Sequence, residues 1–177
     1  MPIALESPDQ PEVIALIAEL DAYQDGLYPP ESRYALDLTS LMQPNVLFLV
    51  ARDYSGTALG CGAMVLQDDY GEIKRMYVSP RGRGQGLGGR LLAELEREAT
   101  GRGCELARLE TGPYQPEALA LYAAAGYERR GPFGRYLDDP LSVFMEKGLV
   151  TMKPQGRQYS VRVEKANAVS HITGSGR

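Results

Sequence analysis

The sequence has few of the residues on which several classes of protein depend. Its two cysteines, Cys61 and Cys104, are too few for a disulfide framework and lack the spacing of metal ligands. The one histidine, His171, lies near the end of the chain, so histidine-based triad chemistry and a metal site are not expected. No stretch approaches the run of about 20 apolar residues that a membrane span requires, and residues 1–6 do not resemble a secretory signal. We therefore expect a cytoplasmic protein without a metal.

The charges are unevenly distributed along the chain. The net charge is −4, but residues 151–177 contain five basic residues and one acidic residue, which leaves an acidic body. An acidic body argues against nucleic-acid binding and mildly favours amine-bearing partners. A length of 177 residues suits one domain, which we expect at residues 1–149, followed by a basic tail at 150–177.

The most informative stretch is residues 72–98, which has the pattern of a strand, a glycine-rich turn and a helix. Five glycines lie in the turn: Gly82, Gly84, Gly86, Gly88 and Gly89. Glycines let backbone N–H groups approach a common point, and the start of a helix adds unpaired N–H groups and a positive dipole. Arg81 and Arg83 add positive charge beside the turn. The residues therefore predict a site for phosphate or pyrophosphate.

Two known glycine loops fit this stretch poorly. A Walker loop requires Gly-Lys followed by Ser or Thr, whereas Gly89 is followed by Arg90 and Leu91. Gly84, Gly86 and Gly89 do spell the dinucleotide fingerprint, and Glu110 lies at about the expected distance beyond it. However, five residues (79–83) separate the strand from these glycines, and too little chain follows for the remaining parallel strands. A dinucleotide-dependent oxidoreductase is thus a distant alternative.

Two motifs resemble those of the GNAT superfamily of acetyl-CoA-dependent N-acyltransferases. Arg81-x-x-Gly84-x-Gly86, after a strand ending in Met76-Tyr77-Val78, is similar to the coenzyme A pyrophosphate loop of that family. Residues 118–127, with Leu121-Tyr122 followed by Gly126-Tyr127, resemble its second signature. The resemblance covers residues 2–149. It implies a mixed α/β fold with six to seven mostly antiparallel strands, a parallel pair at strands four and five, and about four helices.

The expected elements follow from periodicity and turn residues. Strands are expected at residues 3–5, 46–51, 58–67, 72–78, 105–111, 129–131 and 143–147, and a short one in the tail at 159–163. Helices are expected at residues 11–23, 31–42 and 116–125, and one directly after the glycine loop. Short turns join the second, third and fourth strands into an antiparallel meander.

The resemblance also implies which residues bind acetyl-CoA. The backbone of Met76, Tyr77 and Val78 would hold the thioester and the pantetheine arm. The pyrophosphate would lie against Arg81, Arg83, Gly84, Gln85, Gly86, Leu87, Gly88 and Gly89. Gln115 occupies a position where many relatives contact the pantetheine. Tyr122 matches the general acid of the family, although its place on an apolar helix face also suits a core tyrosine.

The catalytic base is open between two carboxylates and a water molecule. Glu72 lies near the start of the fourth strand and Glu110 near the end of the fifth. Strand alternation puts Glu72, Lys74 and Met76 on one face and Arg75 on the other, unless a bulge intervenes. A buried Arg75 needs a carboxylate partner, either internal or from the acceptor. Residues 24–44 and 131–142 would determine specificity, with Tyr28 and Tyr136 as further substrate-binding candidates.

The resulting hypothesis is an N-acetyltransferase that acts on a primary amine of a small molecule. Because both cysteines are predicted on strands rather than beside the loop, direct transfer in a ternary complex is preferred to an acetyl-cysteine intermediate. The alternatives are a protein N-terminal or lysine acetyltransferase and a noncatalytic acyl-CoA sensor. A homodimer is left open.

Overall fold

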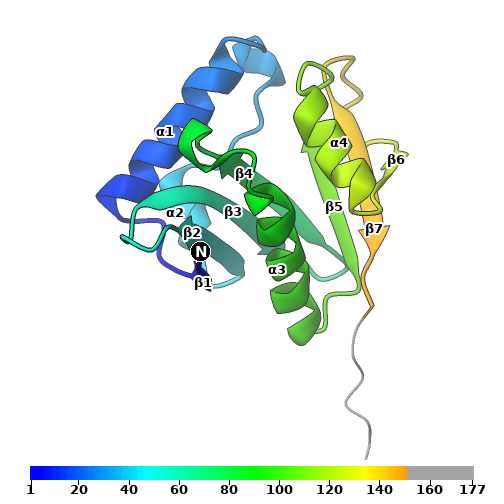
Figure 1. The fold of residues 1–177 in the computed structure, drawn as a ribbon. Helices are drawn as coiled ribbons and strands as arrows, with labels where there is room; N and C mark the ends of the chain where they lie inside the picture. Colours follow the sequence, from blue (N-terminus) through cyan, green and yellow to red (C-terminus); the bar gives the residue numbers. More distant parts are fainter. Residues whose placement is uncertain (151–177) are drawn as a thin grey trace, which may run out of the picture.

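The computed structural model describes residues 1–150, which form a mixed sheet with helices on both faces (Figure 1). The seven strands lie in the order β1-β2-β3-β4-β5-β7-β6, and β4 and β5 are the parallel pair. The strands are β1 (Ile3–Leu5), β2 (Val46–Arg52), β3 (Ala58–Leu66), β4 (Gly71–Val78), β5 (Leu106–Thr111), β6 (Glu128–Arg130) and β7 (Val143–Gly148). The α-helices are α1 (Pro11–Asp25), α2 (Leu38–Leu41), α3 (Leu87–Gly101) and α4 (Pro116–Ala124). The predicted fold class is confirmed.

The tail strand expected at residues 159–163 and His171 lie outside the described residues. Within residues 1–150, no helix is long and apolar enough to cross a membrane.

Two hydrophobic cores, one on each face of the sheet, fix the positions of the helices. On one face α3 buries an apolar stripe, Leu91, Leu92, Leu95 and Ala99, against β2, β3, β4 and β5. On the other face α1 and α2 bury Val13, Leu16 and Leu41 against Phe48, Val50, Cys61 and Ala63. Since β2 and β3 are covered on both faces, their sequences read as almost continuous apolar runs.

The parallel strands β4 and β5 pair over only part of their lengths. The described register joins Gly71, Glu72 and Ile73 to residues 107–109, after which β4 continues to Val78 and β5 to Thr111 without pairing with each other. In Figure 1 the two strands separate upward, with α1 on one side of the gap and α4 on the other. The end of β4 therefore presents backbone N–H and C=O groups to this gap.

A β-bulge lies at the point where the strands separate. Cys61 of β3 pairs with Tyr77 and Ala63 pairs with Lys74, so Arg75 and Met76 together oppose one residue. Arg75 has a φ of 56°, in the left-handed region that is unusual for a non-glycine residue. Met76 packs in the α3 core, whereas Lys74 and Arg75 both bond to the segment at residues 34–36. The bulge thus places Lys74 and Arg75 on the same side of β4, whereas strict alternation would place them on opposite sides.

The helix predicted at residues 31–42 is wrong. The structure has a single 3₁₀ turn at Pro30–Ser32, an extended stretch, and the short α2, which begins after Asp37. The Asp37 carboxylate accepts the N–H of Ser40 and so caps α2 at its start. In the extended stretch, the carbonyls of Tyr34 and Leu36 accept hydrogen bonds from Lys74 and Arg75. These long-range bonds replace helical ones, and local periodicity does not reveal them.

Candidate functional site

Two adjoining cavities occupy the gap between β4 and β5. The first, which we call the loop groove, runs along the glycine loop and the start of α3. The second, which we call the inner cavity, lies between β4, β5 and the segment at residues 28–35 and has a volume of about 90 Å³. Leu20, Met76, Gln115 and Ala118 line both. A molecule in the groove can therefore reach a second molecule in the cavity.

The loop groove has the features of an anion site. Gly84 and Gly86 have φ values of 76° and 71°, and no atom lies within 4 Å of the position a Cβ would take at either residue. Gly86 is the N-cap of α3, and no described side chain caps this helix. The first N–H groups of α3 and its dipole thus face an open groove, and the guanidinium of Arg83 lies beside them.

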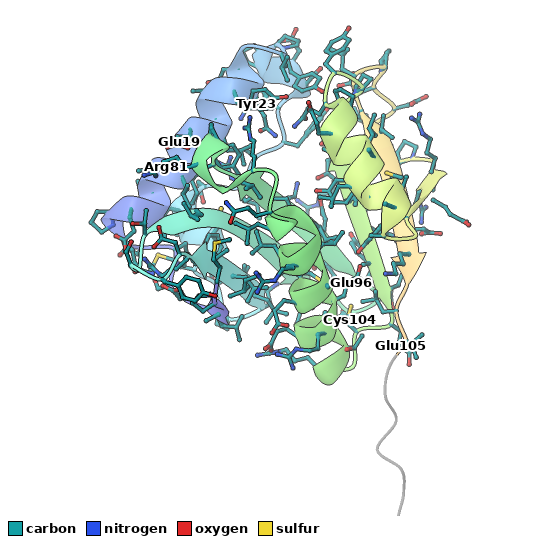
Figure 2. All side chains as sticks on the ribbon, in the orientation of Figure 1. Glu19, Tyr23, Arg81, Glu96, Cys104 and Glu105 are labelled. Atoms are coloured by element: carbon teal, nitrogen blue, oxygen red, sulfur yellow. The ribbon has the colours of Figure 1, made fainter. Side chains whose placement is uncertain are left out.

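The structure brings most of the predicted coenzyme-binding residues to this groove. Those that line it are Met76, Tyr77, Val78, Arg83, Gly84, Gly86, Leu87, Gly88, Gly89 and Gln115. Arg81 and Gln85 line neighbouring surface hollows instead. Figure 2 shows Arg81 beside Glu19 of α1. Sequence reasoning missed Tyr23 of α1 and Leu121 of α4 as groove residues, since Tyr23 carries no motif and Leu121 was identified only as part of the second signature.

Glu110 is the one carboxylate among the described residues that line the inner cavity. Burial raises the pKa of Glu110 to about 7, and the positive charge of Lys74 opposes this rise. A carboxylate with a pKa near 7 accepts a proton readily at neutral pH, which suits a general base. The structure thus places Glu110 where a reacting molecule can contact it.

Glu72, the other predicted base, is engaged by protein groups. Its carboxylate accepts the Tyr136 hydroxyl at 2.5 Å and pairs with the Lys74 ammonium at 3.0 Å. The ammonium of Lys74 also donates to the Tyr34 carbonyl and to the Tyr136 hydroxyl. Glu72 and Tyr136 do not line the inner cavity. The arrangement fixes the orientation of Lys74, which does line it.

Tyr122 lines the inner cavity from α4 and is buried, with 6% of its surface exposed. Burial raises the pKa of its hydroxyl, and the negative charge of Glu110 adds to the effect. Its ring packs edge-on against Tyr127, whose own hydroxyl donates to Glu96. Tyr122 is therefore a core residue that also lines the cavity, and its role as a general acid stays a prediction.

Arg75 has the internal partner that sequence analysis left open. Its guanidinium donates to Asp21 at 2.6 Å and twice to the Leu36 carbonyl. It nevertheless lines the inner cavity, as does Arg33, which the sequence did not single out.

Tyr28 is buried and fixes the loop that follows β5. Its hydroxyl accepts the N–H of Tyr114, and the two rings stack at 5.5 Å. A Cβ at Gly112 would lie 1.9 Å from this hydroxyl oxygen, so no side chain fits there without moving Tyr28. Tyr28 and Gly112 both line the inner cavity. The close contact therefore shapes the cavity wall.

We expect Gly112→Ala to destabilise the protein by about 1–3 kcal/mol, because the added methyl group overpacks this contact. The free energy of unfolding, measured with urea, checks the expectation. In a Tyr28→Ala background the same substitution should cost much less, since the clashing ring is gone. Equal costs in both backgrounds would contradict this account of the contact.

The two cysteines lie away from the reacting groups. Cys61 is buried on β3, and burial raises its thiol pKa to about 12. Cys104 precedes β5 rather than lying on it, and Figure 2 shows it at the opposite end of the sheet from Tyr23. Neither lines the loop groove or the inner cavity. The geometry is consistent with direct transfer rather than a cysteine intermediate.

Comparisons with known proteins agree with this arrangement. The family model described as Acetyltransferase (GNAT) family matches residues 14–127. The chain is 52% identical to a protein of Azospirillum brasilense named IAA acetyltransferase, over 83% of this chain and 97% of that protein. It is 37% identical to an uncharacterised N-acetyltransferase, YsnE, of Bacillus subtilis, over 78% of this chain and 93% of the relative.

Among solved structures, a candidate acyl-CoA N-acyltransferase from Klebsiella pneumoniae matches with a TM-score of 0.72. It is 45% identical in sequence, and the match covers 84% of this chain and 97% of that one. The residues that the family model matches include the glycine loop, Glu110 and Tyr122.

Proposed function

The chain belongs to the GNAT family of acetyltransferases, and from this premise we propose that it transfers an acetyl group from acetyl-CoA to a primary amine of a small molecule. One observation carries the proposal. Glu110 and Tyr122, from different elements, line the same small cavity, and that cavity adjoins the loop groove. A base and an acid thus lie at the point where two substrates would meet.

In this proposal acetyl-CoA lies in the loop groove. Its pyrophosphate would contact the N–H groups at the start of α3 and Arg83, in the region of residues 83–89. Its arm would follow the unpaired end of β4, where the N–H of Met76 or Tyr77 donates to the thioester carbonyl. Gln115, which lines both cavities, would contact the pantetheine. Arg81 and Gln85 are proposed to contact only the outer part of the coenzyme, since they face away from the groove.

The proposed reaction moves three protons. Glu110 takes a proton from the acceptor ammonium, and the free amine attacks the thioester carbon. As the carbon–sulfur bond breaks, the Tyr122 hydroxyl donates its proton to the leaving sulfur, and the proton that the nitrogen loses as it becomes an amide restores the Tyr122 hydroxyl. We assign the base to Glu110 rather than Glu72, because Glu72 is bonded to Tyr136 and Lys74 and does not line the cavity. Glu72 and Tyr136 instead orient Lys74, and Tyr28 shapes the acceptor site.

Calorimetric titration with acetyl-CoA, with NAD in parallel, tests the coenzyme. We expect saturable binding of acetyl-CoA and weakening by about 10-fold or more in Gly86→Val, because a branched side chain is strained at this φ and enters the groove. Gly103→Val is the matched control, since Gly103 also has a positive φ of 82° but lies beyond the far end of α3. It should lose stability without losing affinity.

Other outcomes of the titration separate the alternatives. Binding of NAD alone would contradict the proposal, and binding of neither would mean that the groove is not a coenzyme site. Binding of acetyl-CoA without thiol release in the presence of any amine would favour a sensor. The acceptor panel includes IAA, the compound in the relative's name, and peptides with free N-termini or lysines.

Two further parts of the proposal concern the cytoplasmic location of the protein and its assembly. The free cysteines Cys61 and Cys104 suit the reducing conditions of the cytoplasm. A homodimer is proposed from the charge difference between the acidic body and the basic tail, and light scattering at two salt concentrations tests it.

A further inference from the structure

Two largely buried guanidinium groups lie side by side at the wall of the inner cavity. Arg33 and Arg75 line the cavity, and their side chains are 13% and 7% exposed. Both donate to the same oxygen of Asp21, at 3.0 Å and 2.6 Å. They come from distant parts of the chain, one from the segment after α1 and the other from the bulge in β4.

The carboxylates around this pair neutralise it incompletely. Asp21 serves both arginines with one oxygen, and its side chain is 38% exposed. The other partner, Asp25, pairs with Arg33 alone and is 70% exposed, so water screens its charge. Two nearly buried positive charges therefore share one partly buried negative charge, and positive potential remains at this wall.

The pair also has hydrogen-bonding capacity left. Each guanidinium has five N–H groups, and the described contacts of Arg33 and of Arg75 use three on each. Lys74, the third cation of the cavity, donates two hydrogen bonds and pairs with the largely buried carboxylate of Glu72, so its charge is balanced. Unused donors and unbalanced charge thus coincide on the two arginines and not on Lys74.

We propose that the acceptor carries an anionic group, a carboxylate or a phosphonate, in addition to its amine, and that Arg33 and Arg75 bind this group. The inference rests on the proposed function, because it specifies the acceptor of the same reaction. Planar guanidinium groups match the oxygens of such anions and hold them with two parallel hydrogen bonds. With the anion fixed at this wall, the amine is directed to Glu110 and Tyr122, which line the same cavity. The same two charges repel polyamines and other purely cationic acceptors.

Matched acceptor pairs test the proposal. We would measure kcat/KM for β-alanine and 2-aminoethylphosphonate against propylamine and ethylamine, with thiol release as the readout. At least one acidic member should exceed its neutral partner by about 10- to 100-fold, as expected for hydrogen bonds to a charged group. The ratio between the two acids shows which anion the site prefers.

Arginine variants test the assignment of the residues. Arg33→Gln and Arg75→Gln should each reduce the acidic-to-neutral ratio toward 1. Arg97→Gln, which removes an exposed arginine of α3 that lines neither cavity, should leave the ratio unchanged. If Arg75→Gln unfolds because the bulge needs its bonds to Leu36 and Asp21, Arg33→Gln and inhibition of the wild type decide the question. Propionate should inhibit competitively against the amine, and propanol should not.

The outcomes separate this inference from the proposed function. Acetylation of both members of each pair at similar rates would overturn the anion site and leave the amine acetyltransferase intact. Failure to acetylate any amine, with acetyl-CoA bound, would overturn the proposed function. A selectivity ratio that survives both arginine variants would overturn the assignment of the site to Arg33 and Arg75.

Discussion

Replacing Glu110 by glutamine is expected to lower kcat/KM for the amine by about 100-fold or more, because the acceptor loses the group that takes its proton. Glutamine has nearly the same shape as glutamate, so acetyl-CoA should still bind with wild-type affinity. Steady-state rates of thiol release and calorimetry with acetyl-CoA measure the two quantities separately.

The pH profile gives this substitution a signature that a structural defect would not. Burial raises the pKa of Glu110 to about 7. Because the base must be ionised, kcat/KM of the wild type should rise with pH up to about 7 and then level off. In Glu110→Gln this rise should disappear. Glu105→Gln is the matched control, since Glu105 is exposed at the other end of β5 (Figure 2).

Glu110→Gln should affect the stability of the protein in the opposite direction to its activity. The folded protein binds the Glu110 proton more tightly than the unfolded chain, so ionisation of Glu110 destabilises the fold as pH rises from the ordinary range of a glutamate to about 7. Glutamine removes this cost. The free energy of unfolding of Glu110→Gln, relative to the wild type, should therefore be higher above pH 7 than at pH 5. If Glu72→Gln rather than Glu110→Gln abolishes the rise in the rate with pH, Glu72 is the base.

Most of the fold was predictable because its signals are local. The expected strand at 72–78 and the helix after the glycine loop correspond to β4 and α3. The prediction at residues 31–42 failed because Tyr34 and Leu36 bond to β4 through their carbonyls. The residues of that segment do not reveal that their hydrogen-bond donors lie about 40 positions later in the chain.

The candidate site was predictable where it depends on backbone and less so where it depends on side chains. The glycine loop needs particular φ values, so glycines mark it in the sequence. The choice between Glu72 and Glu110 depends on Lys74 and on Tyr136, and Tyr136 contacts the Glu72 carboxylate from a distant part of the sequence. No sequence pattern marked Arg33, because its proposed role in anion binding follows from sharing Asp21 with Arg75. The bulge at Arg75 decides which side chains face the cavity, and alternation alone could not locate it.

Tyr122→Phe is expected to lower kcat by about 100-fold, because the departing sulfur loses its proton donor. Burial keeps the hydroxyl protonated by raising its pKa above that of an ordinary tyrosine, so the residue serves as an acid throughout the neutral range. The ring, which carries the packing against Tyr127, is retained in phenylalanine, so the fold and acetyl-CoA binding should be preserved. Thiol release under saturating substrates checks the expectation.

Tyr127→Phe provides a matched control on the neighbouring ring. Tyr127 is also buried, but its hydroxyl donates to Glu96 and it does not line the inner cavity. Loss of the Tyr127 hydroxyl should cost about 1 kcal/mol of stability, typical of one hydrogen bond, without a comparable loss of kcat. If a thioester with a better leaving thiol is used, the defect of Tyr122→Phe should shrink, because a thiolate of lower pKa needs less protonation on departure. An unchanged defect, or equal defects in the two variants, would mean that the Tyr122 hydroxyl acts through packing rather than proton transfer.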